Sequence, residues 1–241
     1  MTPALITGAS SGIGEATAHA LAADGNDVAL LARREERLAD LADTLRTEYD
    51  VTAVPTPADV RSRAAVENAI ETATDALGRL DAVVANAGLA RGSTVTELTD
   101  EEYFAMQETN VDGMFFVARA TLPDLIETEG TFVAIGSFAG QFPRSFNPVY
   151  AATKWWVRGF AHSLAAQFGD RGVGVSIINP SEVRTEFGGQ DGESFADQFA
   201  PGEVTAPEEV ADAVAFAVDQ SPSSVQELNL YRRDKYADSG F

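Results

Sequence analysis

The chain has 241 residues and is strongly acidic, because 37 Asp and Glu residues stand against 17 Lys and Arg residues and give a formal net charge of -20. A field of this sign repels phosphate backbones and anionic lipid surfaces, so we expect neither nucleic acid nor a membrane as a partner. Cysteine is absent and only two histidines occur, which excludes thiolate nucleophiles and disulfides and predicts no metal site.

The acidity comes with a scarcity of lysine, since Lys154 and Lys235 are the only two lysines in the chain. This balance resembles the surface composition of proteins from salt-loving organisms. In low salt such a surface repels itself, and at 1 M salt screening shortens the reach of that repulsion to about 3 Å. The sequence shows neither a charged N-terminal segment followed by an apolar stretch nor a long apolar run, so we expect a cytoplasmic protein.

The first elements follow the order strand, glycine turn, helix. A short apolar run at residues 4–6 precedes a Gly/Ser cluster at residues 8–14, and the Ala-rich stretch that continues to about residue 24 predicts a helix. The pattern then repeats, because the apolar run at residues 28–32 predicts a buried strand and the leucine spacing of residues 35–49 predicts an amphipathic helix.

The same alternation continues to the end of the chain. Further strands are predicted at residues 51–54, 82–85, 131–135, 173–178 and 226–230, and further helices at residues 61–77, 100–125, 148–168 and 208–219. Strands that are apolar throughout and alternate with helices predict a parallel sheet covered on both faces. No Pro/Ser-rich linker interrupts the pattern, so we expect residues 1–241 to form a single domain. Residues 188–207 are rich in Gly and acidic residues and predict a mobile substrate flap, with a plain surface insertion as the alternative.

The glycine turn is suited to binding a phosphate. In Thr7-Gly8-Ala9-Ser10-Ser11-Gly12-Ile13-Gly14, glycines let the backbone approach a pyrophosphate, and the following helix offers free N–H groups and the positive end of its dipole. The spacing GxxxGxG differs from GxGxxG and from a P-loop.

The second strand ends in Arg33 and Arg34 rather than in an acidic residue, which predicts recognition of a 2′-phosphate on the adenosine ribose. The alternative is that both arginines are merely solvated beside Glu35 and Glu36.

A tyrosine and a lysine lie one helical turn apart in Tyr150-Ala151-Ala152-Thr153-Lys154. A fixed ammonium beside a phenol favours the phenolate and so predicts acid–base chemistry at Tyr150. Ser137, at the end of an earlier apolar run, could place a hydroxyl beside the phenol across the connecting loop. Asn110 would place an amide inside a predicted helix. Singly, a turn hydroxyl and a surface amide are the ordinary alternatives for Ser137 and Asn110.

Together these residues resemble the short-chain dehydrogenase/reductase family over essentially the whole chain. Thr7 to Gly14 is similar to its TGxxxGxG motif, and Asp59-Val60 to its adenine contact. Further matches are Asn86-Ala87-Gly88 to the end of its NNAG motif, Asn110, Ser137, Tyr150 and Lys154 to its catalytic tetrad, and Pro180, Val183 and Thr185 to its PGxVxT segment. Departures include Gly136 in place of the commoner serine, and Ser181 and Glu182 after Pro180.

The resemblance implies an α/β protein made of a single doubly wound (Rossmann) domain, with a parallel seven-stranded sheet and helices on both faces. It implies an NADP(H)-dependent enzyme that interconverts a ketone or aldehyde and an alcohol, including 3-hydroxy acid or 3-oxoacyl types. Tyr150 would be the general acid and Ser137 would polarise the carbonyl oxygen. Lys154 would bind the nicotinamide ribose and lower the pKa of the phenol, and Asn110 would hold a water of the proton relay. The alternative is a non-catalytic NADP-binding regulatory or scaffold protein.

The same resemblance assigns the remaining residues of the site. The expected cofactor contacts are Gly8, Ser10, Ser11, Gly12, Ile13, Gly14, Arg33, Arg34, Asp59, Val60, Asn86, Ala87, Gly88, Tyr150, Lys154, Pro180, Val183 and Thr185. The expected substrate cleft, for a small carbonyl or alcohol compound, comprises Phe138, Gln141, Phe142, Arg144, Phe146, Phe187 and Phe195. A homotetramer or homodimer formed through the helices that carry Asn110 and Tyr150 is expected as well.

Overall fold

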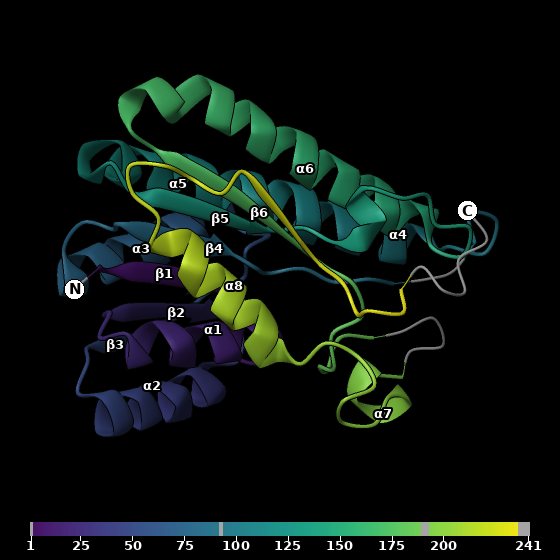
Figure 1. Ribbon diagram of the computed structural model, residues 1–241, viewed down its shortest axis with the longest axis horizontal. Helices are drawn as coiled ribbons and strands as arrows, with labels where there is room; N and C mark the ends of the chain where they lie inside the picture. The colour runs from purple at the N-terminus through teal and green to yellow at the C-terminus, as the bar shows by residue number, and fades with distance from the viewer. Residues whose placement is uncertain (1, 92–93, 189–192, 236–241) are drawn as a thin grey trace.

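Seven parallel strands form one sheet in the order β3-β2-β1-β4-β5-β6-β7 (Figure 1). The computed structural model describes residues 2–91, 94–188 and 193–235. The predicted α/β fold with a doubly wound parallel sheet is confirmed. The strands are β1 (Ala4–Thr7), β2 (Val28–Ala32), β3 (Ala53–Pro57), β4 (Ala82–Ala85), β5 (Thr131–Ile135), β6 (Gly174–Pro180) and β7 (Glu227–Leu230).

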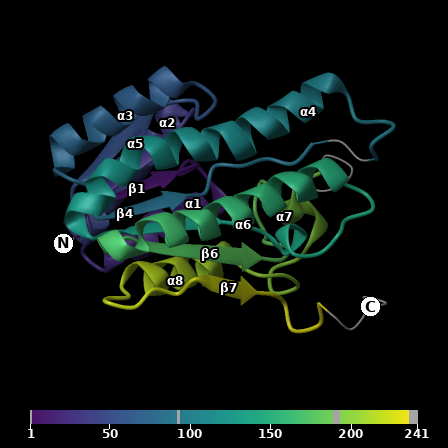
Figure 2. The same ribbon diagram turned by 90° about the horizontal axis from the view of Figure 1, so that it is seen from above.

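Helices cover both faces of the sheet (Figure 2). One core lies between the sheet and the buried faces of α3, α5 and α6, and a second core lies between the opposite sheet face and α1, α2 and α8. The helices are α1 (Gly12–Ala23), α2 (Glu35–Tyr49), α3 (Arg63–Leu77), α4 (Asp100–Gln107), α5 (Gly113–Thr128), α6 (Pro148–Phe168), α7 (Phe195–Gln198) and α8 (Pro207–Val218).

The central strands are apolar throughout because both of their faces are buried. In β1, Leu5 belongs to the core beneath α3, α5 and α6, whereas Ala4 and Ile6 belong to the core beneath α1, α2 and α8. All three side chains are fully buried. Successive strand residues point to opposite faces, so a strand between two layers of helices needs an unbroken apolar sequence rather than an alternating one.

Two predicted elements differ from the structure by more than two residues at an end. The third strand occupies Ala53–Pro57 rather than residues 51–54, because β3 is an edge strand that pairs only with β2 and therefore tolerates Pro55 and Pro57. The helix predicted at residues 100–125 is divided into α4 and α5 by a π-helical turn at Glu108–Asp112. Turns of this kind commonly mark functional sites, and this one contains Asn110.

The segment after β6 folds back across the carboxyl edge of the sheet. Val183 pairs with Thr205 in a parallel bridge, and the backbone N–H of Phe195 donates to the carbonyl of Phe187 over 2.9 Å. Of the flap predicted at residues 188–207, residues 189–192 lie outside the described residues, and the mobility of the flap stays a prediction. Among the helices described, none is both long enough and apolar enough to cross a membrane.

Candidate active site

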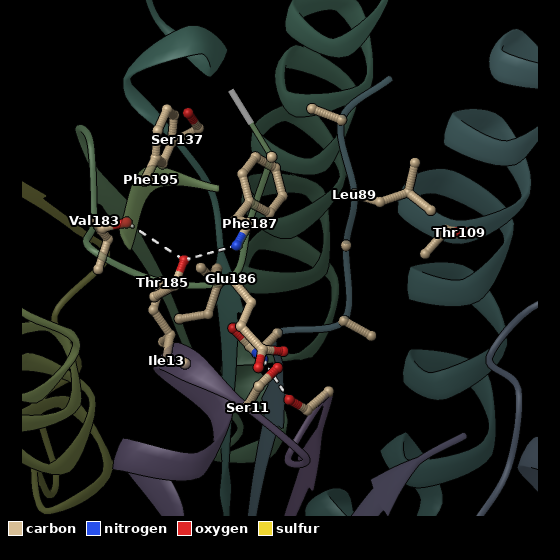
Figure 3. A pocket seen from close by; sticks show the side chains of 18 of the residues that line it. Ser11, Ile13, Leu89, Thr109, Ser137, Val183, Thr185, Glu186, Phe187 and Phe195 are labelled. Atoms are coloured by element: carbon tan, nitrogen blue, oxygen red, sulfur yellow. Dashed lines mark hydrogen bonds between the residues drawn. The ribbon is translucent and has the colours of Figure 1, made fainter. Parts of the chain in front are cut away.

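A cavity of about 620 Å³ lies at the carboxyl ends of the strands and extends from the glycine turn to the flap (Figure 3). In Figure 3, Ser11 and Ile13 lie at one end of the cavity, and Ser137, Phe187 and Phe195 lie at the other. Most of the predicted site residues line it, namely Gly8, Ser10, Ser11, Gly12, Ile13, Arg33, Arg34, Asp59, Val60, Asn86, Ala87, Gly88, Ser137, Tyr150, Lys154, Pro180, Val183 and Thr185. Gly14 and Asn110 are not among the lining residues and lie behind the wall.

The glycine turn is braced from the end of β4. The Thr7 hydroxyl accepts hydrogen bonds from the backbone N–H groups of Asn86 and Ala87, both over 2.9 Å. The Asn86 amide donates to the Thr7 carbonyl over 2.9 Å. A Cβ on Gly14 would lie 2.3 Å from the Gly8 carbonyl oxygen, so a glycine is required there by close backbone approach. Asn86 therefore shapes the turn as well as lining the cavity.

The N-terminus of α1 faces this cavity without a side-chain cap. Ser11 is the N-cap residue, but its hydroxyl makes no capping hydrogen bond and instead accepts from the Arg34 guanidinium over 2.6 Å. Uncapped N–H groups in the first turn are donors that an anion can satisfy, and the helix dipole adds to the attraction. Glycines, free donors and a long cavity together fit the pyrophosphate of a dinucleotide.

Arg34 is held in place at the end of the cavity that lies beside β2. Its guanidinium donates to the Ser10 hydroxyl over 3.0 Å and forms an ion pair with Glu186 over 2.9 Å. Arg37 contacts the same carboxylate over 2.9 Å, and the two guanidiniums lower the pKa of Glu186. Arg33 is exposed and lines the cavity. Two of these guanidiniums therefore already bind one oxyanion, the carboxylate of Glu186.

Asp59 and Val60 line the cavity from the loop after β3. The Asp59 carboxylate accepts two hydrogen bonds from the Arg61 Nε, over 3.0 and 3.1 Å, and this guanidinium lowers the pKa of Asp59. Val60 packs against α5 so closely that a Cβ on Gly113 would lie 2.8 Å from its Cγ2. The negative charge that Asp59 presents to the cavity is therefore already paired with Arg61.

Lys154 is buried on α6, with only 5% of its surface exposed. Its Nζ donates to the Ile135 carbonyl over 2.9 Å and lies 5.9 Å from the centre of the Tyr150 ring. Burial lowers the pKa of Lys154 to about 8. The helical spacing of four residues therefore places both groups on the wall of one cavity, as predicted.

The pKa of Tyr150 shifts in the direction opposite to the one expected from the sequence. Burial raises it above the usual value of 10.0, while a hydrogen bond with Ser137 and the positive charge of Arg144 oppose the rise. The buried Lys154 amine is not among the groups that lower it. Near neutral pH the phenol is therefore protonated, which is the state a proton donor needs.

Asn110 lies close to the cavity but its amide is engaged with the backbone. Its Oδ1 accepts from the Leu89 N–H over 2.9 Å, and its Nδ2 donates to the Leu89 carbonyl over 2.9 Å and to the Thr153 hydroxyl over 3.0 Å. A Cβ on Gly88 would lie 3.3 Å from the Asn110 Oδ1 and 3.6 Å from the Lys154 Nζ. The structure thus places Asn110 beside Lys154 and shows it anchoring the segment after β4.

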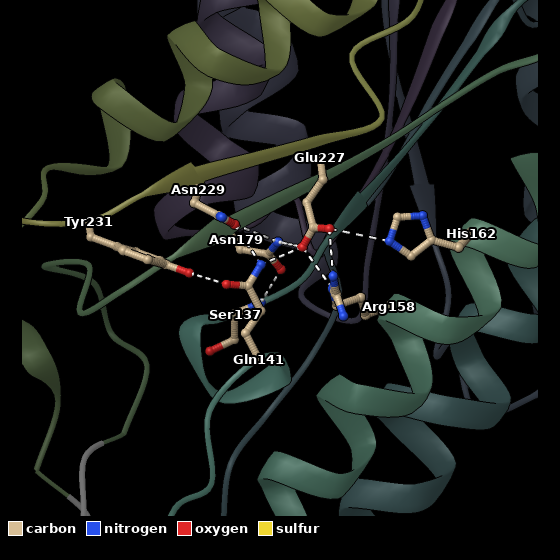
Figure 4. A network of polar contacts seen from close by, with 8 residues as sticks. All are labelled: Ser137, Gln141, Arg158, His162, Asn179, Glu227, Asn229 and Tyr231. Atoms are coloured by element: carbon tan, nitrogen blue, oxygen red, sulfur yellow. Dashed lines mark hydrogen bonds and ion pairs between the residues drawn. The ribbon is translucent and has the colours of Figure 1, made fainter. Parts of the chain in front are cut away.

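Ser137 is fixed by a polar network behind the cavity (Figure 4). Its backbone N–H donates to the Asn179 Oδ1 over 3.1 Å, and the Asn179 Nδ2 donates to the carboxylate of Glu227 over 2.8 Å. Arg158 binds both oxygens of that carboxylate over 2.8 and 2.9 Å, and chiefly this contact lowers the pKa of Glu227 to about 2. Glu227 is thus ionised at any working pH and anchors Asn179 beside Ser137.

The network explains why residue 136 is a glycine. A Cβ at Gly136 would lie 2.1 Å from the Asn179 Oδ1, so the amide of Asn179 occupies the space that a side chain would need. The departure from the commoner serine is therefore matched by the fully buried Asn179 at the end of β6.

Aromatic side chains form the end of the cavity that lies beside Tyr150. The Tyr150 and Phe187 rings lie 5.9 Å apart, Phe187 and Phe195 lie 6.1 Å apart, and Phe195 and Phe199 lie 6.0 Å apart. The cavity-lining members of the expected cleft are Phe138, Arg144, Phe146, Phe187 and Phe195.

Two residues of the expected cleft lie elsewhere. Gln141 donates to Glu227 and to the Asn229 side chain and so belongs to the network behind Ser137. Phe142 stacks on Phe138 with ring centres 4.5 Å apart and does not line the cavity. Both are close in sequence to lining residues, and the short helical turn at Phe138–Gly140 directs them away.

Sequence reasoning missed the residues that support the site. Asn179 and Glu227 come from strands that lie beside each other only in the folded sheet, and Glu186 reaches Arg34 across 152 residues of sequence. Asn179 at the end of an apolar strand, directly before Pro180, was the available signal. The spacing of residues in the sequence offered no signal for Glu186 or for Glu227.

Comparison with known proteins finds one family. The family model for short chain dehydrogenases matches residues 2–196. Sulfoacetaldehyde reductase 2 of Chromohalobacter salexigens is 40% identical over 187 residues, covering 76% of this chain and 73% of the reductase. An alcohol dehydrogenase from the archaeon Thermococcus sibiricus, complexed with 5-hydroxy-NADP, has a TM-score of 0.88 and 32% identity and covers 96% of both chains. The closed form of a serine dehydrogenase complexed with NADP+ has a TM-score of 0.89 and 29% identity, covering 100% of this chain and 99% of that one.

Replacing Gly136 with alanine is expected to destabilise the protein by about 1–3 kcal/mol, because the new Cβ would collide with the Asn179 amide. The double variant Gly136→Ala/Asn179→Ala should be more stable than the sum of the two single effects predicts. Urea unfolding of the four proteins of this cycle measures the coupling. Gly159→Ala is the matched control, since no heavy atom lies within 4 Å of its added Cβ. Additive effects would contradict the proposed collision.

The buried Lys154 predicts a pH-dependent stability. Between about pH 8, its pKa in the folded protein, and the ordinary value of 10.5, the unfolded chain binds a proton that the folded chain does not. Stability therefore rises with pH across this window, by up to about 3 kcal/mol at this site. We expect the unfolding free energy of the wild type, minus that of Lys154→Met, to rise from pH 8 to pH 10. The raised pKa of Tyr150 acts in the opposite direction only above pH 10. A flat difference would contradict the burial of a titrating amine.

Proposed function

The chain belongs to the short-chain dehydrogenase family, and on this premise we propose that it is an NADP(H)-dependent oxidoreductase that interconverts a ketone or aldehyde and the corresponding alcohol. The observation that carries the proposal is the meeting of Ser137, Tyr150 and Lys154 on the wall of one cavity that also contains the uncapped N-terminus of α1. A proton donor and a dinucleotide site in one cavity suit carbonyl reduction.

Each residue has a role that follows from its surroundings. The hydride would be supplied to the carbonyl carbon, or accepted in the reverse direction, by a nicotinamide dinucleotide when one is bound. Tyr150 donates its phenolic proton to the carbonyl oxygen, so one hydride and one proton convert the carbonyl into an alcohol. The Ser137 hydroxyl donates a hydrogen bond to the same oxygen and polarises it. The raised pKa of Tyr150 keeps the proton available for reduction.

Lys154 and Asn110 support the pair formed by Tyr150 and Ser137. The Lys154 amine, held by the Ile135 carbonyl, retains further donors that can bind the nicotinamide ribose. Ribose hydroxyls and a cofactor phosphate nearby would favour its charged form, and that charge would lower the pKa of the phenol. Asn110 fixes the Leu89 segment opposite Lys154 and could hold a water of the proton relay through its neighbouring backbone.

A preference for NADP over NAD is supported by the charges at the end of β2. Arg33 and Arg34 both line the cavity there. Arg34 and Arg37 already bind the carboxylate of Glu186, which shows that this corner accommodates an oxyanion. These ion pairs are largely exposed and each is worth only about 0–1 kcal/mol, so a 2′-phosphate can displace the carboxylate. The alcohol dehydrogenase and the serine dehydrogenase found by comparison are complexed with an NADP analogue and with NADP+.

Self-association would involve the helices α4, α5 and α6. Large apolar side chains are exposed on each of them: Phe104 on α4, Phe115 on α5 and Trp155 on α6. Their exposed fractions are 55%, 39% and 47%, respectively. A homodimer or homotetramer that covers these side chains is part of the proposal.

Tyr150→Phe tests the enzymatic function. The variant lacks the acidic proton but keeps the ring, so NADPH-dependent reduction of ketones, 3-oxo acids and 3-oxoacyl thioesters should fall about 100- to 10,000-fold. NADPH binding, measured by fluorescence titration, should be retained. A wild type that binds NADPH but reduces none of these compounds, with Tyr150→Phe behaving identically, would support a non-catalytic NADP-binding protein instead.

Arg33→Asp tests the cofactor preference. The substitution replaces a phosphate ligand with a carboxylate that suits a free ribose 2′-hydroxyl, so the ratio of kcat/KM for NADPH over NADH should fall about 10- to 100-fold. Arg63→Asp is the matched control, because it makes the same charge change on α3, where Arg63 pairs with Glu67 outside the cavity. If both variants shift the ratio equally, long-range charge and not Arg33 sets the preference.

A further inference from the structure

Arg144 lies at the catalytic end of the cavity, on the loop between Ser137 and α6. Its guanidinium carbon lies 4.4 Å from the centre of the Phe146 ring and 5.7 Å from that of Phe138. Arg144, Ser137 and Tyr150 line the same cavity, and the charge of Arg144 acts on the Tyr150 phenol. A guanidinium is therefore held against two aromatic rings close to the groups that bind the carbonyl oxygen.

No described residue forms a hydrogen bond or an ion pair with Arg144. The cavity also contains three described acidic residues, and each of them is already paired. Asp59 binds Arg61, Glu182 binds Lys235, and Glu186 binds Arg34 and Arg37. Within residues 2–91, 94–188 and 193–235, the charge of Arg144 is thus left without a partner, although the chain as a whole carries an excess of acid.

The cavity concentrates positive charge in a chain where acids outnumber bases. Its described lining contains five cationic and three acidic side chains, against 17 basic and 37 acidic residues in the whole sequence. Arg33 and Arg34 lie at the adenosine end, Lys154 donates to the Ile135 carbonyl, and Arg91 donates to its neighbour, the Ala90 carbonyl. Among the described cations that line the cavity beside Tyr150, Arg144 is the one with no hydrogen-bond or ion-pair partner.

Lys235 also contacts Phe138, but it does not line the cavity and its charge is already paired. The Lys235 Nζ lies 4.6 Å from the centre of the Phe138 ring and forms an ion pair with Glu182, so its charge is cancelled. Stacking on Phe138 and Phe146 leaves the edge of the Arg144 guanidinium free, and its parallel N–H groups match the two oxygens of a carboxylate. A half-buried site strengthens such a contact relative to open water.

We propose that the substrate carries an oxyanion group, a carboxylate or a sulfonate, that Arg144 binds while the carbonyl oxygen contacts Tyr150 and Ser137. This inference rests on the proposed function, because it assigns the substrate class of the same cavity. The aromatic side chains of Phe187 and Phe195 then enclose the apolar part of a small molecule whose charged end is fixed by Arg144.

The test compares substrates that differ in charge. Reduction of acetoacetate and of acetone sulfonate by the wild type with NADPH is compared with reduction of methyl acetoacetate. We expect kcat/KM to favour the anions, and the ratio of anion to ester to fall about 10- to 100-fold in Arg144→Met, the range given by loss of a charge-assisted hydrogen bond. Arg144→Lys should restore part of the ratio. Any effect of Arg144 on the pKa of Tyr150 changes the reduction of the anions and of the ester alike, so it cancels in the ratio.

Arg171→Met is the matched control. Arg171 likewise lies over an aromatic ring, in its case one ring, with its guanidinium carbon 5.9 Å from the centre of Phe168, but it does not line the cavity. Its loss changes the net charge equally and should leave the ratio unchanged. The proposal is overturned if the ratio is unchanged in Arg144→Met, or if Arg171→Met lowers it to the same extent. A preference for one of the two anions identifies the carboxylate or the sulfonate as the natural group.

A binding experiment separates this inference from the proposed function. If the wild type reduces neither these three compounds nor the panel used with Tyr150→Phe, the proposed function fails, and calorimetric titration of butyrate, 1-propanesulfonate and butyramide into the NADP-saturated protein still tests the anion site. Binding of an anion but not of butyramide, lost in Arg144→Met and kept in Arg171→Met, supports the site. Equal binding of all three, or no binding of any, overturns it.

Discussion

The parallel direction of all seven strands is the constraint on which the site depends. Parallel strands end at the same edge of a sheet, so the glycine turn after β1, the arginines after β2, the Asn86 segment after β4, Ser137 after β5 and Pro180 at the end of β6 all converge there. The helices that connect the strands cover both faces and leave this edge as the place for a ligand. Tyr150 and Lys154 join them from the first two turns of α6.

Most of the elements and residues at this edge could be predicted from the sequence, because each motif there follows from requirements of its own segment of the chain. Buried parallel strands need unbroken apolar runs, and β2, β4 and β5 have the predicted bounds. The prolines in β3 led to wrong predicted bounds for this strand, because an edge strand tolerates prolines whereas a central strand does not. The π-helical turn contains Asn110, whose amide bonds to Leu89 and Thr153, 21 and 43 residues away, and no local pattern encodes such contacts.

The supporting residues were harder to find for the same reason. Glu227 acts on Ser137 through Asn179. Ser137 follows β5, Asn179 lies near the end of β6, and Glu227 is the first residue of β7. Only the register of β6 with β7 brings the amide and the carboxylate together. The direction of the pKa shift at Tyr150 was also missed, because a helical spacing shows which charge is near but not how much water is excluded.

The contact between Gly136 and Asn179 has a consequence for how this protein and its relatives can diverge. A Cβ at position 136 and an amide oxygen at position 179 require the same space, 2.1 Å apart. A lineage that exchanges the glycine for serine must therefore first reduce the side chain at position 179, since the reverse order passes through a destabilised intermediate. Identity at one position thus depends on the history of the other, and the two should change together along a phylogeny.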